Sequence, residues 1–404
     1  MARQLSSSVA ARTPLRAVRA RFIDGEPLPS ALLPAVVARS WERSLASGLK
    51  PSQAPVYEGG DAAVRGGRES HADRRLYRSV TDEIERLWEA FGGTDWTIFC
   101  VNAAGTVIHA RRSPDCDDAR LLPIVAGLRL NESNIGTTAP SCVIHDGAET
   151  IVAGDQHYLE DFARIFCLAV PLYGLDGEVA GALDITGVGR RNVAQLREQF
   201  RYASLAAEQR FFTTLRDCHL LHLQHDSRWL GTPLSGVVAV DEDGRVRAAT
   251  RLARRMLGLA QGVPLSGSMQ LRELFAEASP AQQRRLLHPQ RSALRVARAD
   301  GTHLWVQHAR APIDSPVMRR SGGKVAAATT SSSLVGDADA SGDGTASLKE
   351  RALHAVRNAL AEHDGNVAAA ARQLGVSRTT VYAKLNEMRQ AGIAVPARQA
   401  LSPR

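Results

Sequence analysis

The sequence predicts an α+β protein of several domains, and three observations carry this prediction. Strand patterns occur in pairs around short turns in residues 96–187 and again in residues 236–311, as in antiparallel sheets. A Ser-, Gly- and Ala-rich stretch from residue 314 lacks an apolar period and separates a short helical end. A chain of 404 residues is also too long for one ordinary core. We therefore expect an antiparallel sheet domain, a smaller α+β domain and a C-terminal all-α domain.

The composition is that of a folded protein with a basic surface. Apolar residues make up 44% and charged residues 23%, which are ordinary globular values. The formal net charge of +8 favours a polyanionic partner such as nucleic acid. The five cysteines form no C-x-x-C pair, so neither a disulfide framework nor a zinc site is indicated. No apolar run reaches the roughly 18 residues of a membrane span, and we expect a cytoplasmic protein.

Changes in the sequence pattern predict seven parts of the chain. A long helical pattern follows the larger sheet region, and its end near residue 226 marks a boundary. The predicted hairpin turns are Asn102–Gly105, Leu175–Gly177, Asp243–Gly244 and Asp300–Gly301. The expected parts are a basic arm and first amphipathic helix at 1–76, a sheet domain at 77–190, a connecting helix at 191–227, a smaller α+β domain at 228–313, a flexible linker at 314–346, a helix-turn-helix at 347–390 and a tail at 391–404.

The first 23 residues are rich in Arg, Ser and Ala and lack acidic residues. This composition fits an organellar transit peptide as well as a disordered basic arm. The helix expected after it, within "LLPAVVARSWERSLASGL", ends near Gly48.

Two short helices joined by a tight turn are predicted in "GNVAAAARQLGVSRTTVYAKL", residues 365–385. Asn366 caps one helix and Gly375 closes it, and Ser377 caps the next helix two residues later. In a helix-turn-helix, the start of that last helix meets base edges in the major groove, where the fork of Arg378 can bond both acceptors of a guanine. The alternative is a plain three-helix bundle with a basic face. The candidate DNA contacts are Arg378, Thr379, Thr380, Tyr382, Lys384, Asn366 and Ser377.

The same stretch resembles the Fis-type helix-turn-helix that ends bacterial enhancer-binding activators. That pattern runs G-N-x-x-x-A-A-x-x-L-G-[IV]-S-R-x-T-[LV]-Y-x-K-L, and the stretch matches it from Gly365 to Leu385. The resemblance implies a bacterial cytoplasmic protein that binds double-stranded DNA as a homodimer on a roughly palindromic site. It also favours the basic arm over the transit peptide.

The larger sheet region is similar to the GAF sensor domain of the acetoin catabolism regulator family. The residues that carry the likeness are "RLNESNIGTTAP", 129–140, and the run "VAGDQHYLEDFARIFCLAVPLYGLDGEVAGALDITG", 152–187. Gln156 stands where that family usually has Glu. Residues 36–51 resemble the helix that precedes this domain in the family, and residues 236–311 resemble its PAS-like domain. The family implies a small-molecule effector and control of catabolic genes.

Six residues of the sheet region are candidate ligand contacts. Backbone amides around a Gly turn and a threonine hydroxyl suit a small oxygenated molecule. The alternatives are a turn that only defines the fold and a packed histidine. The candidates are Asn134, Ile135, Gly136, Thr137, His157 and Tyr158.

Three cysteines of this region, Cys100, Cys142 and Cys167, admit two interpretations. They could sense redox state, because an exposed thiolate is oxidised reversibly. They could equally be small buried hydrophobes, the usual role of a free cysteine.

An ATPase module is not visible in the sequence. The phosphate-binding pattern G-x-x-x-x-G-K-[ST] does not occur, since Met318 stands at the first Gly position ahead of Gly323-Lys324. No G-x-S-x-G or H-E-x-x-H pattern occurs either. We expect a regulator rather than an enzyme, without catalytic residue, metal or cofactor, and without ATP-driven sigma-54 activation.

Several modes of action stay open for such a chain. Recruitment of RNA polymerase, repression, and antagonism of a full-length relative through mixed dimers all fit. A rival hypothesis is a ligand-binding or protein-interaction module whose terminal bundle mainly dimerises. A hydrolase acting on a cyclic nucleotide fits less well, because a GAF domain alone supplies no metal site.

Overall fold

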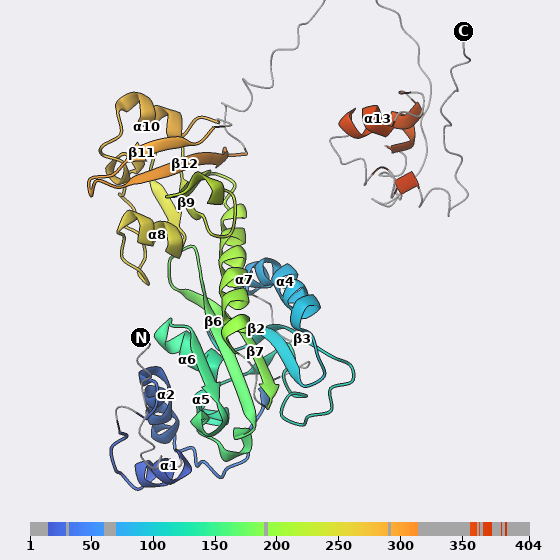
Figure 1. The fold of residues 1–404 in the computed structure, drawn as a ribbon, viewed down its shortest axis with the longest axis vertical. Helices are drawn as coiled ribbons and strands as arrows, with labels where there is room; N and C mark the ends of the chain where they lie inside the picture. Colours follow the sequence, from blue (N-terminus) through green and yellow to red (C-terminus); the bar gives the residue numbers. More distant parts are fainter. Residues whose placement is uncertain are drawn as a thin grey trace, which may run out of the picture. The chain divides into compact units, whose positions relative to one another are not determined.

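The computed structural model describes most of the first 313 residues and a small part of the C-terminal region (Figure 1). The chain divides into two compact units, residues 1–325 and 326–404. Mixed helices and antiparallel sheets confirm the α+β prediction. None of the helices in the described ranges is long and apolar enough to cross a membrane. The described ranges are 15–29, 32–59, 70–189, 193–289, 292–313, 356–361, 363, 367–373, 381 and 384–385.

The first sheet has five antiparallel strands in the order β3-β2-β7-β6-β5. Its hairpins turn where the sequence predicted, with Gly105 and Gly177 at φ 75° and 87°, a region that favours glycine. The strands are β2 (Trp96–Asn102), β3 (Val107–Arg112), β5 (Thr150–Ala153), β6 (Ile165–Tyr173) and β7 (Val179–Val188).

Alternation along these strands gives the first sheet two buried faces. Phe99 and Ala169 point into one core, beside the short helices α5 (Glu132–Ile135) and α6 (Ala139–Asp146). Ile98 and Leu168 point into a second core, which α4 (His71–Phe91) and α7 (Val193–Thr213) cover.

The N-terminal segment differs from the expected arm. Residues Leu15–Ile23 form helix α1, so the prediction of a disordered arm through residue 23 is wrong for its last part. The reason is a packed face: the Phe22 ring lies 6.1 Å from Trp41, and Arg19 is only 1% exposed. Trp41 belongs to α2 (Ala35–Ala46), which lies where the first amphipathic helix was predicted and is followed by Gly48 at φ 79°.

The second sheet also has five antiparallel strands, in the order β10-β9-β8-β12-β11. The hairpins at Asp243–Gly244 and Asp300–Gly301 are confirmed by the pairing of β9 with β10 and of β11 with β12. The strands are β8 (His219–Gln224), β9 (Gly236–Val240), β10 (Val246–Ala249), β11 (Leu294–Ala297) and β12 (His303–Arg310).

The central strand of this sheet lies in a segment that the sequence pattern predicted as helix. The helical prediction through residue 225 is wrong after Thr213, where α7 ends, because His219–Gln224 is strand β8. Leu221 and Leu223 are fully buried in the core of the second sheet, and β8 pairs with both β9 and β12. The second sheet therefore starts before the predicted boundary at residue 228.

Three short helices complete the second sheet's own core. They are α8 (Arg251–Leu257), α9 (Leu271–Leu274) and α10 (Pro280–Leu286). The other face of this sheet, with Val237 and Ala239, joins the core under α4 and α7. Figure 1 shows α7 running from the first sheet to the second. The two sheets of this unit thus share one apolar core.

Candidate ligand cavity and DNA-binding segment

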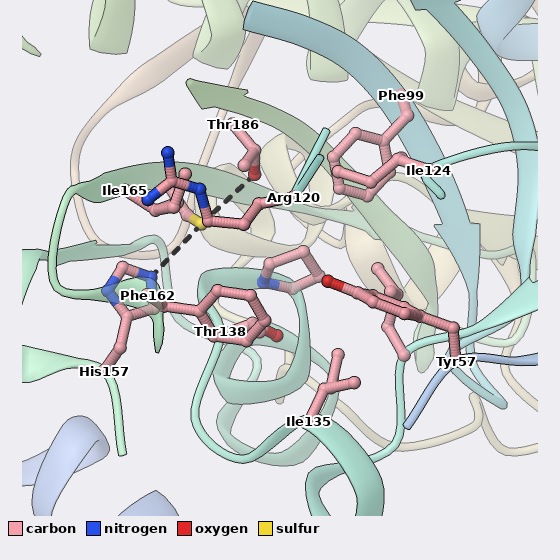
Figure 2. Close-up of a pocket in the computed structure, with 13 residues that line it drawn as sticks. Tyr57, Phe99, Arg120, Ile124, Ile135, Thr138, His157, Phe162, Ile165 and Thr186 are labelled. Carbon is pink, nitrogen blue, oxygen red and sulfur yellow. Dashed lines mark hydrogen bonds between the residues drawn. The ribbon is translucent and has the colours of Figure 1, made fainter. Parts of the chain in front are cut away.

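A small cavity lies on the face of the first sheet that α5 and α6 cover (Figure 2). The volume open to the centre of a water-sized sphere is about 40 Å³. Phe99, Ile135, Phe162 and Ile165 make most of its wall apolar. Few polar groups on an apolar wall are typical of small-molecule sites.

The structure brings two of the six predicted ligand contacts into the cavity wall, Ile135 and His157. The others lie outside it and hold the fold. The Thr137 hydroxyl lies 2.8 Å from the Ser40 hydroxyl, and the Tyr158 hydroxyl donates to the Leu49 carbonyl at 3.0 Å. The remaining two are Asn134, whose carbonyl accepts from the Val56 amide at 3.0 Å, and Gly136, at φ 67°, where an added Cβ would lie 3.1 Å from Tyr158 Cβ. Their role as ligand contacts stays a prediction.

The N-x-I-G-T turn has a structural role that the contacts of Glu132 explain. Glu132 is 8% exposed, and its carboxylate accepts from Arg43 at 2.5 Å and from Ser40 at 2.5 Å. Both partners lie on α2. The Thr138 hydroxyl then caps α6 by accepting from the Ser141 amide. The turn therefore ties α2 to the cavity wall.

A row of four buried polar side chains lies at the floor of the cavity, and three of them, His157, Cys167 and Thr186, line its wall. Thr186 Oγ1 lies 2.6 Å from Asp184 Oδ1 and 3.1 Å from Cys167 Sγ. The same sulfur lies 3.5 Å from His157 Nε2, and His157 Nδ1 lies 3.0 Å from the Gly154 carbonyl. Figure 2 shows the contacts of Cys167 as dashed lines. Strands β6 and β7 thus place three groups of the row, and the 154–162 loop places His157.

Burial disfavours the charged form of each titratable member of this row. Desolvation raises the pKa of Asp184 well above its usual value and raises the pKa of Cys167 likewise. It lowers the pKa of His157 to about 4. The burial of a group disfavours its charged form when no opposite charge compensates.

The partners of His157 fix the donors at its end of the row. His157 Nδ1 must carry the hydrogen, because its neighbour is a carbonyl oxygen, so Nε2 accepts from the Cys167 thiol. The Thr186 hydroxyl is the donor toward its two neighbours, the Asp184 carboxyl and the Cys167 sulfur. The three side chains of the row that line the cavity, His157, Cys167 and Thr186, therefore donate to groups of the protein. We call these four side chains the polar floor.

Two further polar residues, Tyr57 and Arg120, stand at the mouth of the cavity. The Arg120 guanidinium donates to both oxygens of Asp118, at 2.9 and 2.5 Å. Tyr57 is held in place because β1 (Glu58–Gly59) pairs with β4 (Leu128–Arg129). Neither residue was a candidate ligand contact, and no pattern in the sequence around them indicates such a role.

The 154–162 loop is held from outside by the N-terminal helices. Arg19 of α1 donates to the His157 carbonyl at 2.8 Å, and Trp41 of α2 donates to the Gln156 carbonyl at 2.8 Å. Gln156, where the resembled family usually has Glu, thus contacts α2 through its backbone. The outer face of the loop is therefore fixed by α1 and α2 while His157 lines the cavity.

The five cysteines are all buried. Desolvation raises the pKa of Cys142 to about 12 and raises that of Cys100. Raised pKa values keep a thiol protonated and slow to oxidise. The structure therefore favours the buried-hydrophobe interpretation for Cys100 and Cys142, and Cys167 acts in the polar floor.

A second buried polar group joins the two sheets, and we call it the clasp. The Glu208 carboxylate on α7 accepts from the Tyr173 amide at 3.1 Å and pairs with Arg251 of α8 at 3.2 Å. Arg251 lies over the Tyr173 ring at 5.6 Å. The Tyr173 hydroxyl donates to the carbonyl of Gly147, which ends α6. The helix whose first turn lines the cavity is therefore bonded to the clasp at its other end.

The C-terminal unit contains helix α13 (Val367–Gln373) and a compact apolar cluster that includes Leu360, Ala370 and Leu385. Lys384 is helical and half-buried. The other candidate DNA contacts lie outside the described residues: Asn366, Ser377, Arg378, Thr379, Thr380 and Tyr382. The expected linker, 314–346, also lies outside them.

Comparison with known proteins places the C-terminal segment in a family. Residues 354–388 match the family model described as bacterial regulatory protein, Fis family. This confirms the Fis-type helix-turn-helix that the sequence predicted. The matched segment includes α13 and the whole apolar cluster.

Two curated proteins resemble part of the chain. The acetoin dehydrogenase operon transcriptional activator AcoR of Bacillus subtilis (strain 168) is 24% identical over 170 residues, which are 41% of this chain and 27% of that protein. An uncharacterized 47.3 kDa protein in the thcA 5'region of Rhodococcus erythropolis is 27% identical over 198 residues, 46% of this chain and 44% of that protein. The chain thus spans less than half the length of either relative.

A solved structure with some similarity is the E. coli DhaR(N)–DhaL complex. It is 16% identical, has a TM-score of 0.39, and its match covers 69% of this chain and 100% of the other chain.

Proposed function

We propose that the chain is a one-component transcription regulator that binds double-stranded DNA through residues 354–388 under the control of a small molecule in the cavity. The Fis-family match carries the DNA-binding half of this proposal. The compact cluster around Leu360 and Leu385 agrees with a folded bundle in that segment. The net charge of +8 favours association with a polyanion.

The cavity and the clasp support the control half. The first turn of α6 lines the cavity with Thr138 and Pro140, and the end of α6 bonds to Tyr173 of the clasp. A ligand that shifts α6 would change the contact between the two sheets. Coupling of this kind requires that the ligand binds one arrangement better than the other.

The remaining parts of the proposal concern assembly and promoter class. A helix-turn-helix of this type acts as a homodimer on two half-sites. No phosphate-binding loop is found in the sequence, so we propose regulation by contact with RNA polymerase or by occlusion, without ATP-driven sigma-54 activation. AcoR is named as an activator of an operon, and activation is the mode that this relative favours.

A gel-shift titration of the full chain on the DNA of its own promoter tests DNA reading. Arg378→Ala should weaken sequence-selective binding by about 1–3 kcal/mol, the worth of a bidentate guanine contact. Arg398→Ala, which removes the same charge from the tail, is the matched control and should leave selectivity unchanged. Equal binding of all DNA by the wild type and Arg378→Ala would contradict the proposal and favour the dimerising bundle.

A further inference from the structure

The mouth of the cavity carries a donor for which the described residues offer no acceptor. The Tyr57 hydroxyl points into the cavity in Figure 2, and no described residue accepts a hydrogen bond from it. Desolvation raises the pKa of this phenol to about 12, so it keeps its proton at neutral pH. A protonated phenol in a partly dry site favours a ligand atom that accepts a hydrogen bond.

The polar floor opposite Tyr57 offers no matching donor. Thr186 donates toward Asp184 and Cys167, the Cys167 thiol donates to His157, and His157 donates to the Gly154 carbonyl. A ligand that needed a donor there would have to break this row. The floor therefore has no spare donor, and the less polar end of a ligand can lie against it.

The cavity also lacks an uncompensated charge for an ionic ligand. Arg120 is the cation at the mouth, and Asp118 already accepts from its Nε and Nη2 atoms. Asp161 adds a second carboxylate near Tyr57 and Arg120. An ionised ligand would lose its hydration on entering the cavity and would gain no partner of opposite charge there. This exchange is costly in an apolar site.

The size of the space limits the ligand further. An opening of about 40 Å³ to a water-sized sphere has room for about three water molecules. An apolar cavity of this kind is filled well by a compact molecule with few heavy atoms.

We propose that the cavity takes a small uncharged molecule with an apolar body and one acceptor oxygen, and that the Tyr57 hydroxyl selects it by donating to that oxygen. The apolar body lies against Phe99, Ile135 and Phe162, and the oxygen faces the mouth. This inference rests on the proposed sensing function, since it names the ligand class of the same cavity.

Thermal unfolding of the full chain with three probes tests this specificity. The probes are butan-2-one, 1-chlorobutane and propanoate, which have equal numbers of heavy atoms. Apparent dissociation constants come from the rise of Tm with probe concentration, because a ligand of the folded state stabilises it by mass action. We expect both uncharged probes to raise Tm and propanoate to leave it unchanged.

Tyr57→Phe isolates the hydroxyl because it keeps the ring. It should weaken butan-2-one binding by about fivefold, the loss of one neutral hydrogen bond, and leave 1-chlorobutane binding unchanged. Tyr77→Phe removes a hydroxyl from an exposed ring on α4 and should change neither. The two variants differ only in whether the lost hydroxyl faces the cavity.

Three results would overturn the inference. Propanoate could stabilise as much as butan-2-one, Tyr57→Phe could bind butan-2-one as well as the wild type, or neither uncharged probe could raise Tm. The gel-shift titration tests the proposed DNA binding separately. Selective probe binding with DNA binding that ignores every cavity ligand would sustain this inference and refute ligand control.

Discussion

The two sheets of this protein have the same number of strands and different centres. In the first sheet the last strand, β7, lies at the centre, and its buried face carries Asp184 and Thr186. In the second sheet the first strand, β8, lies at the centre and presents Leu221 and Leu223. A polar central strand leaves a cavity with hydrogen-bonding groups, whereas an aliphatic one gives a packed core. The first sheet is thus suited to binding and the second to packing.

The largest expected effect comes from the packed sheet. Leu223→Ala should lower the free energy of unfolding by about 2–5 kcal/mol, because it leaves a cavity in a fully buried core. Denaturant unfolding measures this loss. Ile135→Ala at the cavity wall is the matched comparison and should cost less, since space already adjoins that side chain. Equal losses would show that the two cores are packed alike.

The next effect concerns the clasp between the sheets. Glu208 is 1% exposed, and desolvation raises its pKa to about 7 from the ordinary 4.5 of a glutamate side chain. A raised pKa in an acid means that stability from this group is fully present below about pH 4.5 and is lost as pH rises through 7. The loss amounts to about 3 kcal/mol by the size of the shift.

Glu208→Gln tests that linkage because it removes the titration and keeps the shape. Unfolding measured from pH 5 to pH 8 should show a smaller decline in the variant than in the wild type. His157 contributes with the opposite sign, since its lowered pKa makes its share of stability fall as pH drops below 6.5, so the difference between variants isolates Glu208. Identical pH profiles for the wild type and Glu208→Gln would show that titration of Glu208 does not change the free energy of unfolding.

The smallest effect is expected at the mouth of the cavity. Tyr57→Phe should change the free energy of unfolding without ligand by less than about 0.5 kcal/mol, since the hydroxyl has no partner among the described residues. Denaturant unfolding checks this value. A loss above about 1 kcal/mol would show that the hydroxyl serves the fold instead of a ligand.

Local signals in the sequence predicted the hairpins but not the centre of the second sheet. Turns such as Asp243–Gly244 carry their own backbone preference, so they can be found without tertiary information. Strand β8, "HLLHLQ", has too few residues to separate from a helix by its period. Its pairing with β12, whose residues lie far along the chain, decides its conformation. Helix α1 was missed for the same reason, because its packing partner is Trp41.

Two of the six candidate ligand contacts, Ile135 and His157, lie in the wall of the cavity, whereas Asp184 and Thr186 of the polar floor were not candidates. Cys167 and Thr186 lie in the quoted run, and alternation along β6 and β7 puts them on one buried face. His157 was found from the same run. Tyr57 and Arg120 could not be found, because their places depend on the β1–β4 pairing and on Asp118 in irregular chain segments.

We expect occupation of the first sheet's cavity to change DNA binding by the C-terminal segment. Ile135→Phe fills that cavity from its wall, and Ile313→Phe adds the same bulk at a site that is 53% exposed. The measurement is the dissociation constant of each full-length variant on the promoter DNA, with cooperative thermal unfolding as the check of folding. We expect that Ile135→Phe shifts this constant severalfold and that Ile313→Phe does not. Identical constants for a folded Ile135→Phe variant and the wild type would contradict it.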